Sequence, residues 1–121
     1  MMVDAGKVLS GFYEAVARKD IPAARAFLDE KLIFVGLFET YPNAQSYIEA
    51  LTGLLSITVR LDVMKIVAEG DHAAVFFELV TKEPAAATTL VAELHRIRDG
   101  KIVHARSAFD GRPFAAMFGA G

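Results

Sequence analysis

The first half of the chain carries a helical pattern of apolar positions. Between residues 6 and 20 the apolar side chains recur three and four positions apart, which is typical of one buried helix face. They are Val8, Leu9, Phe12, Tyr13 and Val16. Asp20 and Pro22 then suit the cap and first turn of a second helix over residues 21–30. That helix would bury Ala24, Phe27 and Leu28.

A short strand and a third helix follow. Residues 31–40 predict a β segment in which Gly36 permits a bend. Asn43 follows a turn and can cap the third helix, whose apolar stripe runs to residue 55. The stripe consists of Tyr47, Ile48, Leu51, Leu54 and Leu55.

After Ser56 the pattern changes from helical to alternating, which indicates strands. The first strand begins at residue 57, and Lys65 breaks its alternation, so we predict a β-bulge near Val63–Met64. A strand over residues 73–81 should bury Val75, Phe77 and Leu79. Residues 88–98 and 101–109 predict a final hairpin around Asp99–Gly100.

Helices followed by a run of antiparallel strands indicate an α+β fold with the helices on one face of the sheet. The 121 residues suit a single domain over residues 1–121. A net charge of −2 argues against nucleic-acid binding. The chain lacks cysteine, a long apolar run and a signal-like N-terminus, so we expect a cytoplasmic protein with no membrane segment and no thiolate metal site.

The final hairpin places Glu93 two residues from His95, on one face of a largely apolar strand. A two-residue turn would set Glu93 opposite Arg106 on a polar outer surface, and polarity alone favours this register. A three-residue turn would set Glu93 opposite Ala105 and His95 opposite Val103, inside the fold. In the outer register His95 and His104 could form a metal pair, but no third ligand is evident.

The order of elements, with three local stretches, resembles the nuclear transport factor 2-like superfamily and its SnoaL-like and ketosteroid-isomerase-like members. The stretches are "FYEAVARKDIPAARAFLDEKLIFVG", the helix that Asn43 caps, and "HRIRDGKIVHARSAFD". The resemblance implies a cone-shaped, curved antiparallel sheet wrapped round a pocket, with three helices on its concave face. It also implies homodimers, often formed through the outer face of the sheet.

The catalytic residues of these relatives correspond only in part. Where ketosteroid isomerases have a tyrosine on the first helix, this chain has Phe12, with Tyr13 one place away. Gly36 stands in place of their base, and only Glu93 keeps an acid. Ser107 stands where SnoaL-type cyclases carry an acid, and the full Asp–Arg–Asp pattern of epoxide hydrolases is absent. The steroid isomerase reaction is therefore not expected.

The resemblance places the acid position inside, so we expect Glu93 and His95 in the pocket, with Arg96, His104 and Arg106 outside. A buried carboxyl beside an imidazole suits general acid/base chemistry. We expect the pocket to be formed by mainly apolar and aromatic residues. They are Phe12, Tyr13, Phe34, Tyr41, Phe77, Ala105, Ser107 and Phe109.

Two functions stay open at this stage. The first is cofactor-free isomerisation, dehydration or cyclisation of a small apolar or carbonyl-containing molecule, with Glu93 as acid/base and His95 as its partner. The second is a non-catalytic ligand-binding or dimeric interaction module of the same fold, since this superfamily hosts many functions. An open pocket that reaches the Glu93 carboxyl would favour the first.

Overall fold

The structure is a computed structural model and describes residues 4–117. Each of its three α-helices begins at a polar cap, and the caps of the second and third helices are those that the sequence predicts. Asp4 caps α1 (Ala5–Ala17), and Asp20 caps α2 (Ile21–Arg25) with Pro22 in its first turn. Asn43 caps α3 (Ala44–Leu55), accepting a hydrogen bond from the Ser46 amide at 2.8 Å.

The second helix is shorter than its sequence pattern predicts. Phe27 and Leu28 continue the apolar spacing of α2, yet Leu28 already begins strand β1 (Leu28–Val35). Leu28 pairs with Ile102, and the Ile102 amide donates to the Phe27 carbonyl at 2.8 Å. Pairing with the last strand therefore overrides a helical pattern that is local to the sequence.

Six strands form one curved, unclosed sheet in the order β2-β1-β6-β5-β4-β3. The others are β2 (Thr40–Tyr41), β3 (Thr58–Glu69), β4 (His72–Thr81), β5 (Ala87–Arg98) and β6 (Lys101–Ala108). β1 runs parallel to β6, and every other neighbouring pair is antiparallel. A 3₁₀ helix (Arg112–Phe114) follows β6. The predicted α+β class is confirmed.

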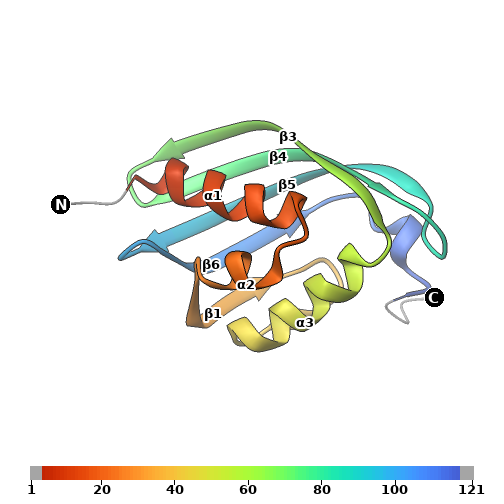
Figure 1. The fold of residues 1–121 in the computed structure, drawn as a ribbon, viewed down its shortest axis with the longest axis horizontal. Coiled ribbons are helices and arrows are strands. Elements are labelled where there is room, and N and C mark those ends of the chain that lie inside the picture. The colour runs from red at the N-terminus through yellow and green to blue at the C-terminus, as the bar shows by residue number, and fades with distance from the viewer. Residues whose placement is uncertain (1–3, 118–121) are drawn as a thin grey trace.

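Strand β3 has the predicted bulge, since its register with β4 shifts between Val63 and Lys65. β4 buries Val75, Phe77 and Leu79 on its inner face, also as predicted. A bulge increases the local twist of a strand, which suits the bent course of β3 in Figure 1.

The final hairpin differs from both registers considered for it. Its turn has two residues, Asp99 and Gly100, both with positive φ (52° and 76°), as a type I′ turn requires. Arg98 pairs with Lys101, and Ile97 with Ile102, before Val103 bulges out of register.

Because of the bulge at Val103, the inward-facing residues of β5 and β6 lie opposite one another on both sides of it. Glu93 then lies opposite Ser107, and His95 opposite Ala105. The expected three-residue turn is therefore wrong, although Glu93 and His95 do lie on the inner face. Arg96, His104 and Arg106 are exposed on the outer face, as expected.

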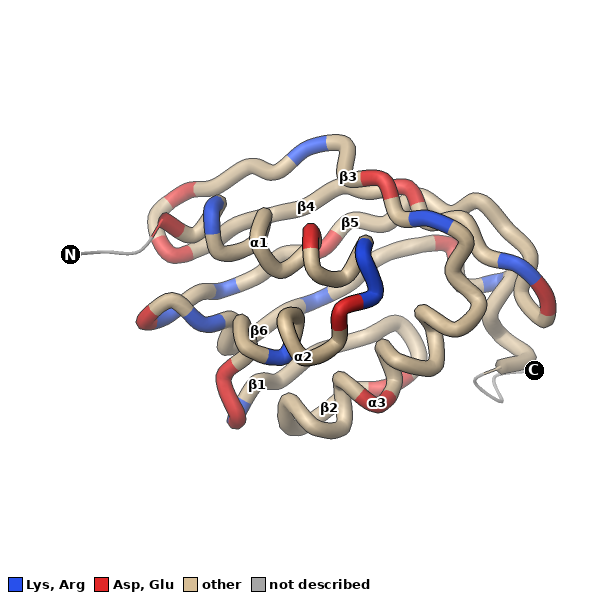
Figure 2. The backbone as a smooth tube through the Cα atoms, in the orientation of Figure 1, with Lys and Arg blue, Asp and Glu red and all other residues tan. Residues whose placement is uncertain are grey.

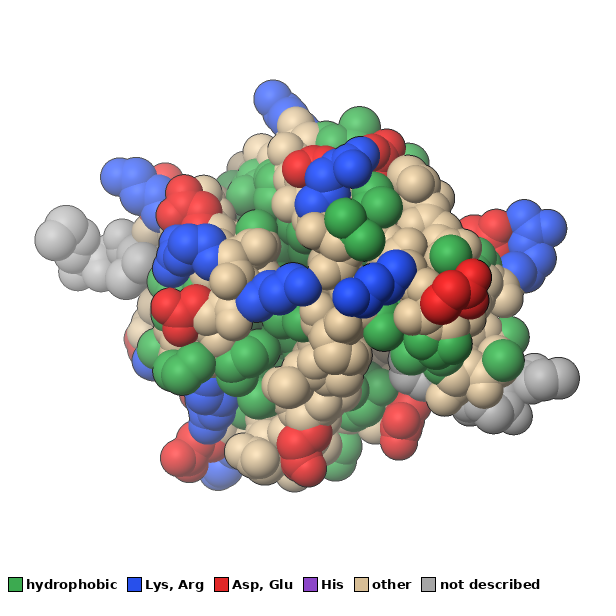
Figure 3. Space-filling model, turned by 45° about the vertical axis from the view of Figure 1, so that its right-hand side comes forward, with side chains coloured by type: hydrophobic (Ala, Val, Ile, Leu, Met, Phe, Trp, Pro, Cys, Tyr) green, Lys and Arg blue, Asp and Glu red, His purple; other side chains and the backbone are tan. Residues whose placement is uncertain are grey.

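The helices cover the inner face of the sheet. α1 packs on β3 and β4, and α3 packs on β1, so the core fills the space between them. Most charged residues lie on turns and exposed positions around this core (Figure 2). The surface turned forward in Figure 3 carries hydrophobic side chains among residues of both charge signs. No helix within residues 4–117 is long and apolar enough to cross a membrane.

Candidate functional site

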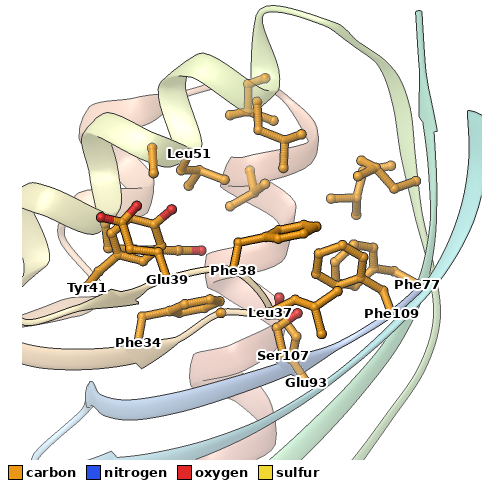
Figure 4. A pocket seen from close by; sticks show the side chains of 18 of the residues that line it. Phe34, Leu37, Phe38, Glu39, Tyr41, Leu51, Phe77, Glu93, Ser107 and Phe109 are labelled. Atoms are coloured by element: carbon orange, nitrogen blue, oxygen red, sulfur yellow. The ribbon is translucent and has the colours of Figure 1, made fainter. Parts of the chain in front are cut away.

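A cavity lies between the inner face of the sheet and the helices α1 and α3 (Figure 4). Its volume is about 120 Å³. Its lining comes from all parts of the fold and is mainly apolar and aromatic, which is typical of small-molecule sites. The lining residues are Tyr13, Val16, Phe34, Gly36, Leu37, Phe38, Glu39, Tyr41, Tyr47, Ala50, Leu51, Leu54, Leu55, Leu61, Phe77, Leu79, Glu93, Ser107 and Phe109.

Three elements bring a polar cluster to one end of the cavity. α1 contributes Tyr13, β5 contributes Glu93, and β6 contributes Ser107 opposite Glu93. Glu93 and Ser107 are each 8% exposed, so they contact the cavity while remaining almost fully buried. Figure 4 shows the two side chains together on the floor of the cavity.

The two oxygens of Glu93 have different surroundings. Oε1 accepts a hydrogen bond from the Tyr13 hydroxyl and lies 3.3 Å from Nε2 of His95. Oε2 makes no hydrogen bond to any side chain or backbone group within residues 4–117. One oxygen therefore holds the carboxyl in place, and the other remains available to a molecule in the cavity.

His95 lies behind Glu93 rather than in the cavity wall. Its side chain is 1% exposed, and its ring meets Tyr13 edge to face with centroids 5.9 Å apart. Despite the 3.3 Å approach to Glu93, neither ring nitrogen makes a hydrogen bond of acceptable geometry within the described part of the chain. His95 therefore contacts the carboxyl from inside the core and cannot touch a ligand directly.

Two buried tyrosines face the same carboxyl. Burial, followed by the charge of Glu93, raises the pKa of Tyr13 well above its ordinary value. Burial and the same charge likewise raise the pKa of Tyr47. Both phenols therefore stay protonated over the whole neutral range, and Tyr13 can act as a hydrogen-bond donor to Glu93.

The structure brings most of the expected pocket residues to the cavity. Six of the eight predicted ligand-binding residues line it: Tyr13, Phe34, Tyr41, Phe77, Ser107 and Phe109. Phe12 and Ala105 do not line it, and each is 1% exposed within the core. Tyr13, and not Phe12, is the α1 residue that contacts Glu93.

The outer His pair does not form, because His95 faces inward and His104 lies opposite Arg96 on the outer face. Between residues 4 and 117 no group of three or more His, Cys, Asp or Glu side chains could hold a metal ion.

Sequence reasoning missed Tyr47, Glu39 and Leu37 as cavity residues. Tyr47 could have been recognised from the sequence, because a tyrosine in an otherwise aliphatic buried stripe needs a polar partner or a hydrated space for its hydroxyl. Its ring stacks on Phe34 with centroids 4.2 Å apart. Glu39 and Leu37 lie in the loop between β1 and β2, and nothing in the local sequence reveals that this loop borders the cavity.

The comparison with protein families agrees with this architecture. The family model described as "SnoaL-like domain" matches residues 9–105, which is most of the chain. The chain belongs to the SnoaL-like domain family. The resemblance seen in the sequence is thereby confirmed. No curated protein sequence matches this SnoaL-like chain significantly.

Solved structures share the SnoaL-like fold at low sequence identity. A protein from Kribbella flavida has a TM-score of 0.87 at 18% identity, with 98% of this chain and 97% of that chain covered. An NTF2-like protein of unknown function from Cytophaga hutchinsonii has a TM-score of 0.80 at 19% identity, covering 93% and 96%. An LEH-like epoxide hydrolase from M. tuberculosis has a TM-score of 0.75 at 18% identity, covering 97% and 90%.

Proposed function

We propose that this SnoaL-like chain binds a small, largely apolar carbonyl compound in the cavity and catalyses a cofactor-free proton transfer on it. Isomerisation, dehydration and cyclisation all begin with such a step. Glu93 is the acid/base in this proposal. The observation that supports it most directly is the Glu93 carboxyl among the residues that line the cavity, with an Oε2 that makes no hydrogen bond within residues 4–117.

The proposed step is the removal of a proton from the carbon next to the substrate carbonyl. Oε2 of Glu93 takes this proton, the C–H electron pair forms an enolate, and the same carboxyl can return the proton at another position. Such a base must come within hydrogen-bond reach of the proton that it removes. A well-positioned base increases the reaction rate roughly 10²–10⁴-fold. The apolar walls exclude competing water.

The neighbours of Glu93 have separate roles in this proposal. Tyr13 donates to Oε1 and fixes the carboxyl plane, so the reactive Oε2 points to the substrate. His95 is a positioning residue, because it contacts Glu93 without lining the cavity. The Ser107 hydroxyl, opposite Glu93, can donate a hydrogen bond to the substrate oxygen.

The lining chemistry gives little support to epoxide hydrolysis, the activity in the name of the M. tuberculosis neighbour. In the described part of the chain Glu39 and Glu93 are the acidic lining residues, and no arginine is among the residues that line the cavity.

A matched pair of variants tests the proposal without knowledge of the natural substrate. The protein is incubated with small ketones and aldehydes in D₂O, and NMR follows the loss of the α-proton signals. The wild type should accelerate this exchange, and Glu93→Gln should reduce the acceleration by roughly 10²–10⁴-fold while retaining shape and binding. Glu30→Gln, an exposed acid that does not line the cavity, should leave it unchanged.

A non-catalytic binding module is the alternative outcome. It would be indicated by ligands that bind in the cavity, seen as NMR shifts of lining residues, without exchange above the rate in buffer. The single-domain organisation, the cytoplasmic location and the homodimer expected from the sequence remain parts of this proposal.

A further inference from the structure

Within residues 4–117 the charged groups that line the cavity are all acidic. Glu39 and Glu93 are among these lining residues, whereas no Lys, Arg or His is among them. An anionic ligand would lose its hydration on entry and find no counter-charge, which is strongly unfavourable. A neutral ligand meets no such penalty, and a cationic ligand gains an attractive interaction.

The two acids lie in different parts of the cavity. Figure 4 shows Glu39 beside Tyr41 on one side and Glu93 beside Ser107 on the floor. Glu39 is exposed, whereas Glu93 is 8% exposed. Glu39 therefore marks the mouth, and the proposed reaction centre lies at the closed end.

Backbone pairing fixes the position of Glu39 at the mouth. The Gly36 amide donates to the Glu39 carbonyl at 2.9 Å and closes the loop between β1 and β2. The side chain interacts with the neighbouring phenol: burial, then the charge of Glu39 and its hydrogen bond, raise the pKa of Tyr41. Glu39 and Tyr41 thus form a polar pair directly above the apolar walls.

Two further aromatic rings, those of Phe34 and Tyr47, lie near Tyr41 of this pair. Phe34 stacks on Tyr47 at 4.2 Å, and Tyr41 lies 6.3 Å from Phe34 and 6.2 Å from Tyr47, measured between ring centroids. The face of an aromatic ring carries partial negative charge and attracts ammonium groups. The Glu39 carboxylate and the Tyr41 ring therefore act on the same region of the mouth.

We propose that the ligand of this cavity carries a basic nitrogen, whose ammonium group binds at the mouth beside Glu39 and Tyr41 while its apolar part extends toward Glu93. This inference rests on the proposed function in one respect only, namely that this cavity binds a small molecule. It names Glu39 as the residue that determines the charge of the ligand, a role separate from any catalysis at Glu93.

Three probes of similar shape test the inference: 2-phenylethylamine, 2-phenylethanol and phenylacetate. Each is titrated into the full chain at pH 7, with affinity measured from NMR shifts of cavity residues. We expect the amine to bind about fivefold tighter than the alcohol, since an exposed ion pair and a cation–π contact each contribute modestly. We expect phenylacetate to bind weaker than the alcohol.

Matched variants assign the effect to Glu39. Glu39→Gln should bring the affinity for the amine down to that for the alcohol, while the affinity for the alcohol changes less than about twofold. Glu30→Gln removes the same charge elsewhere on the surface and should keep the preference for the amine. In 0.5 M NaCl the preference should shrink, because the Debye length falls well below 10 Å.

The outcomes separate this inference from the proposed function. Equal binding of amine and alcohol, a preference for phenylacetate, or an unchanged preference in Glu39→Gln would overturn the amine assignment and leave a small-molecule site intact. Failure of all three probes to bind at millimolar concentration would overturn the amine assignment together with the claim that the cavity is a small-molecule site.

Discussion

Replacement of Tyr13 by phenylalanine tests the contact on which the site depends. The change removes one hydroxyl from a side chain that is 3% exposed and leaves the ring and its packing in place. Oε1 of Glu93 then loses its hydrogen-bond donor and keeps only the 3.3 Å approach of His95, which lacks hydrogen-bond geometry. No new cavity forms, so the cost is almost wholly that of the lost hydrogen bond.

The expected magnitude follows from the charge of the acceptor. Hydrogen bonds to charged groups contribute about 1.5–3 kcal/mol. The Phe variant regains part of this free energy, because it no longer buries a polar hydroxyl. We therefore expect Tyr13→Phe to lower the free energy of unfolding by about 2 kcal/mol at pH 7.

Tyr47→Phe is the matched control. Tyr47 is 7% exposed and lines the same cavity, but its hydroxyl makes no hydrogen bond within residues 4–117. Loss of this hydroxyl should change the free energy of unfolding by less than about 0.5 kcal/mol, the usual range for a change that breaks no specific contact. The chain has no tryptophan, so urea unfolding is followed by far-UV circular dichroism.

A double-mutant cycle completes the test. In a Glu93→Gln background the Tyr13 hydroxyl donates to a neutral amide oxygen, and such a bond is roughly half as strong. Tyr13→Phe should then cost only about 1 kcal/mol. Equal costs for the two tyrosine variants, or the same cost of Tyr13→Phe in both backgrounds, would refute a charge-assisted bond between Tyr13 and Glu93.

Three further outcomes are expected. Phe77→Ala should destabilise the fold by about 3–4 kcal/mol in denaturant titration, because Phe77 is 5% exposed but faces a cavity on one side; a loss below about 1 kcal/mol would contradict its inward position. Above pH 10 the unfolded chain releases phenol protons that Tyr13 and Tyr47 retain when folded, since burial raises their pKa. This stability is fully present below pH 10, and these two phenols should lower it by up to about 2.7 kcal/mol per pH unit above that, as measured by unfolding against pH; Tyr47→Phe should reduce the slope by up to about 1.4 kcal/mol per pH unit, and an unchanged slope would contradict the assignment. Finally, the outer face exposes 38% of Phe76 and 52% of Leu94, so sedimentation at micromolar concentration should show a dimer that Leu94→Arg dissociates, whereas a wild-type monomer would argue against this interface.

The sequence carries most of the information for the elements and less for their pairing. Caps at Asp20 and Asn43 mark two of the helix starts, because capping is a local hydrogen bond. The end of α2 could not be predicted in the same way, because Leu28 joins a strand through its partner Ile102, which is distant in sequence.

The candidate site likewise combines features that follow from the local sequence with features that depend on pairing between strands. Alternation places Glu93 and His95 on one face of β5, and that prediction needs only local geometry. Whether the face is inner or outer depends on the bulge at Val103, which no residue type specifies. Similarly, Phe12 and Tyr13 are 1% and 3% exposed, so burial alone could not tell which one approaches Glu93.

The bulge at Val103 has a consequence for how related chains could diverge. If Val103 were taken into the ladder as a regular pair with Arg96, the two-residue turn would set Arg106 opposite Glu93. The acid would then leave the cavity wall without any change to its own codon. Deletion of Val103 would instead remove the bulge and keep Glu93 opposite Ser107, because the pairs on either side of Val103 already have that register. Related chains with this turn should therefore tolerate loss of the bulged residue, whereas changes that draw it into the ladder should abolish activity even though Glu93 is retained.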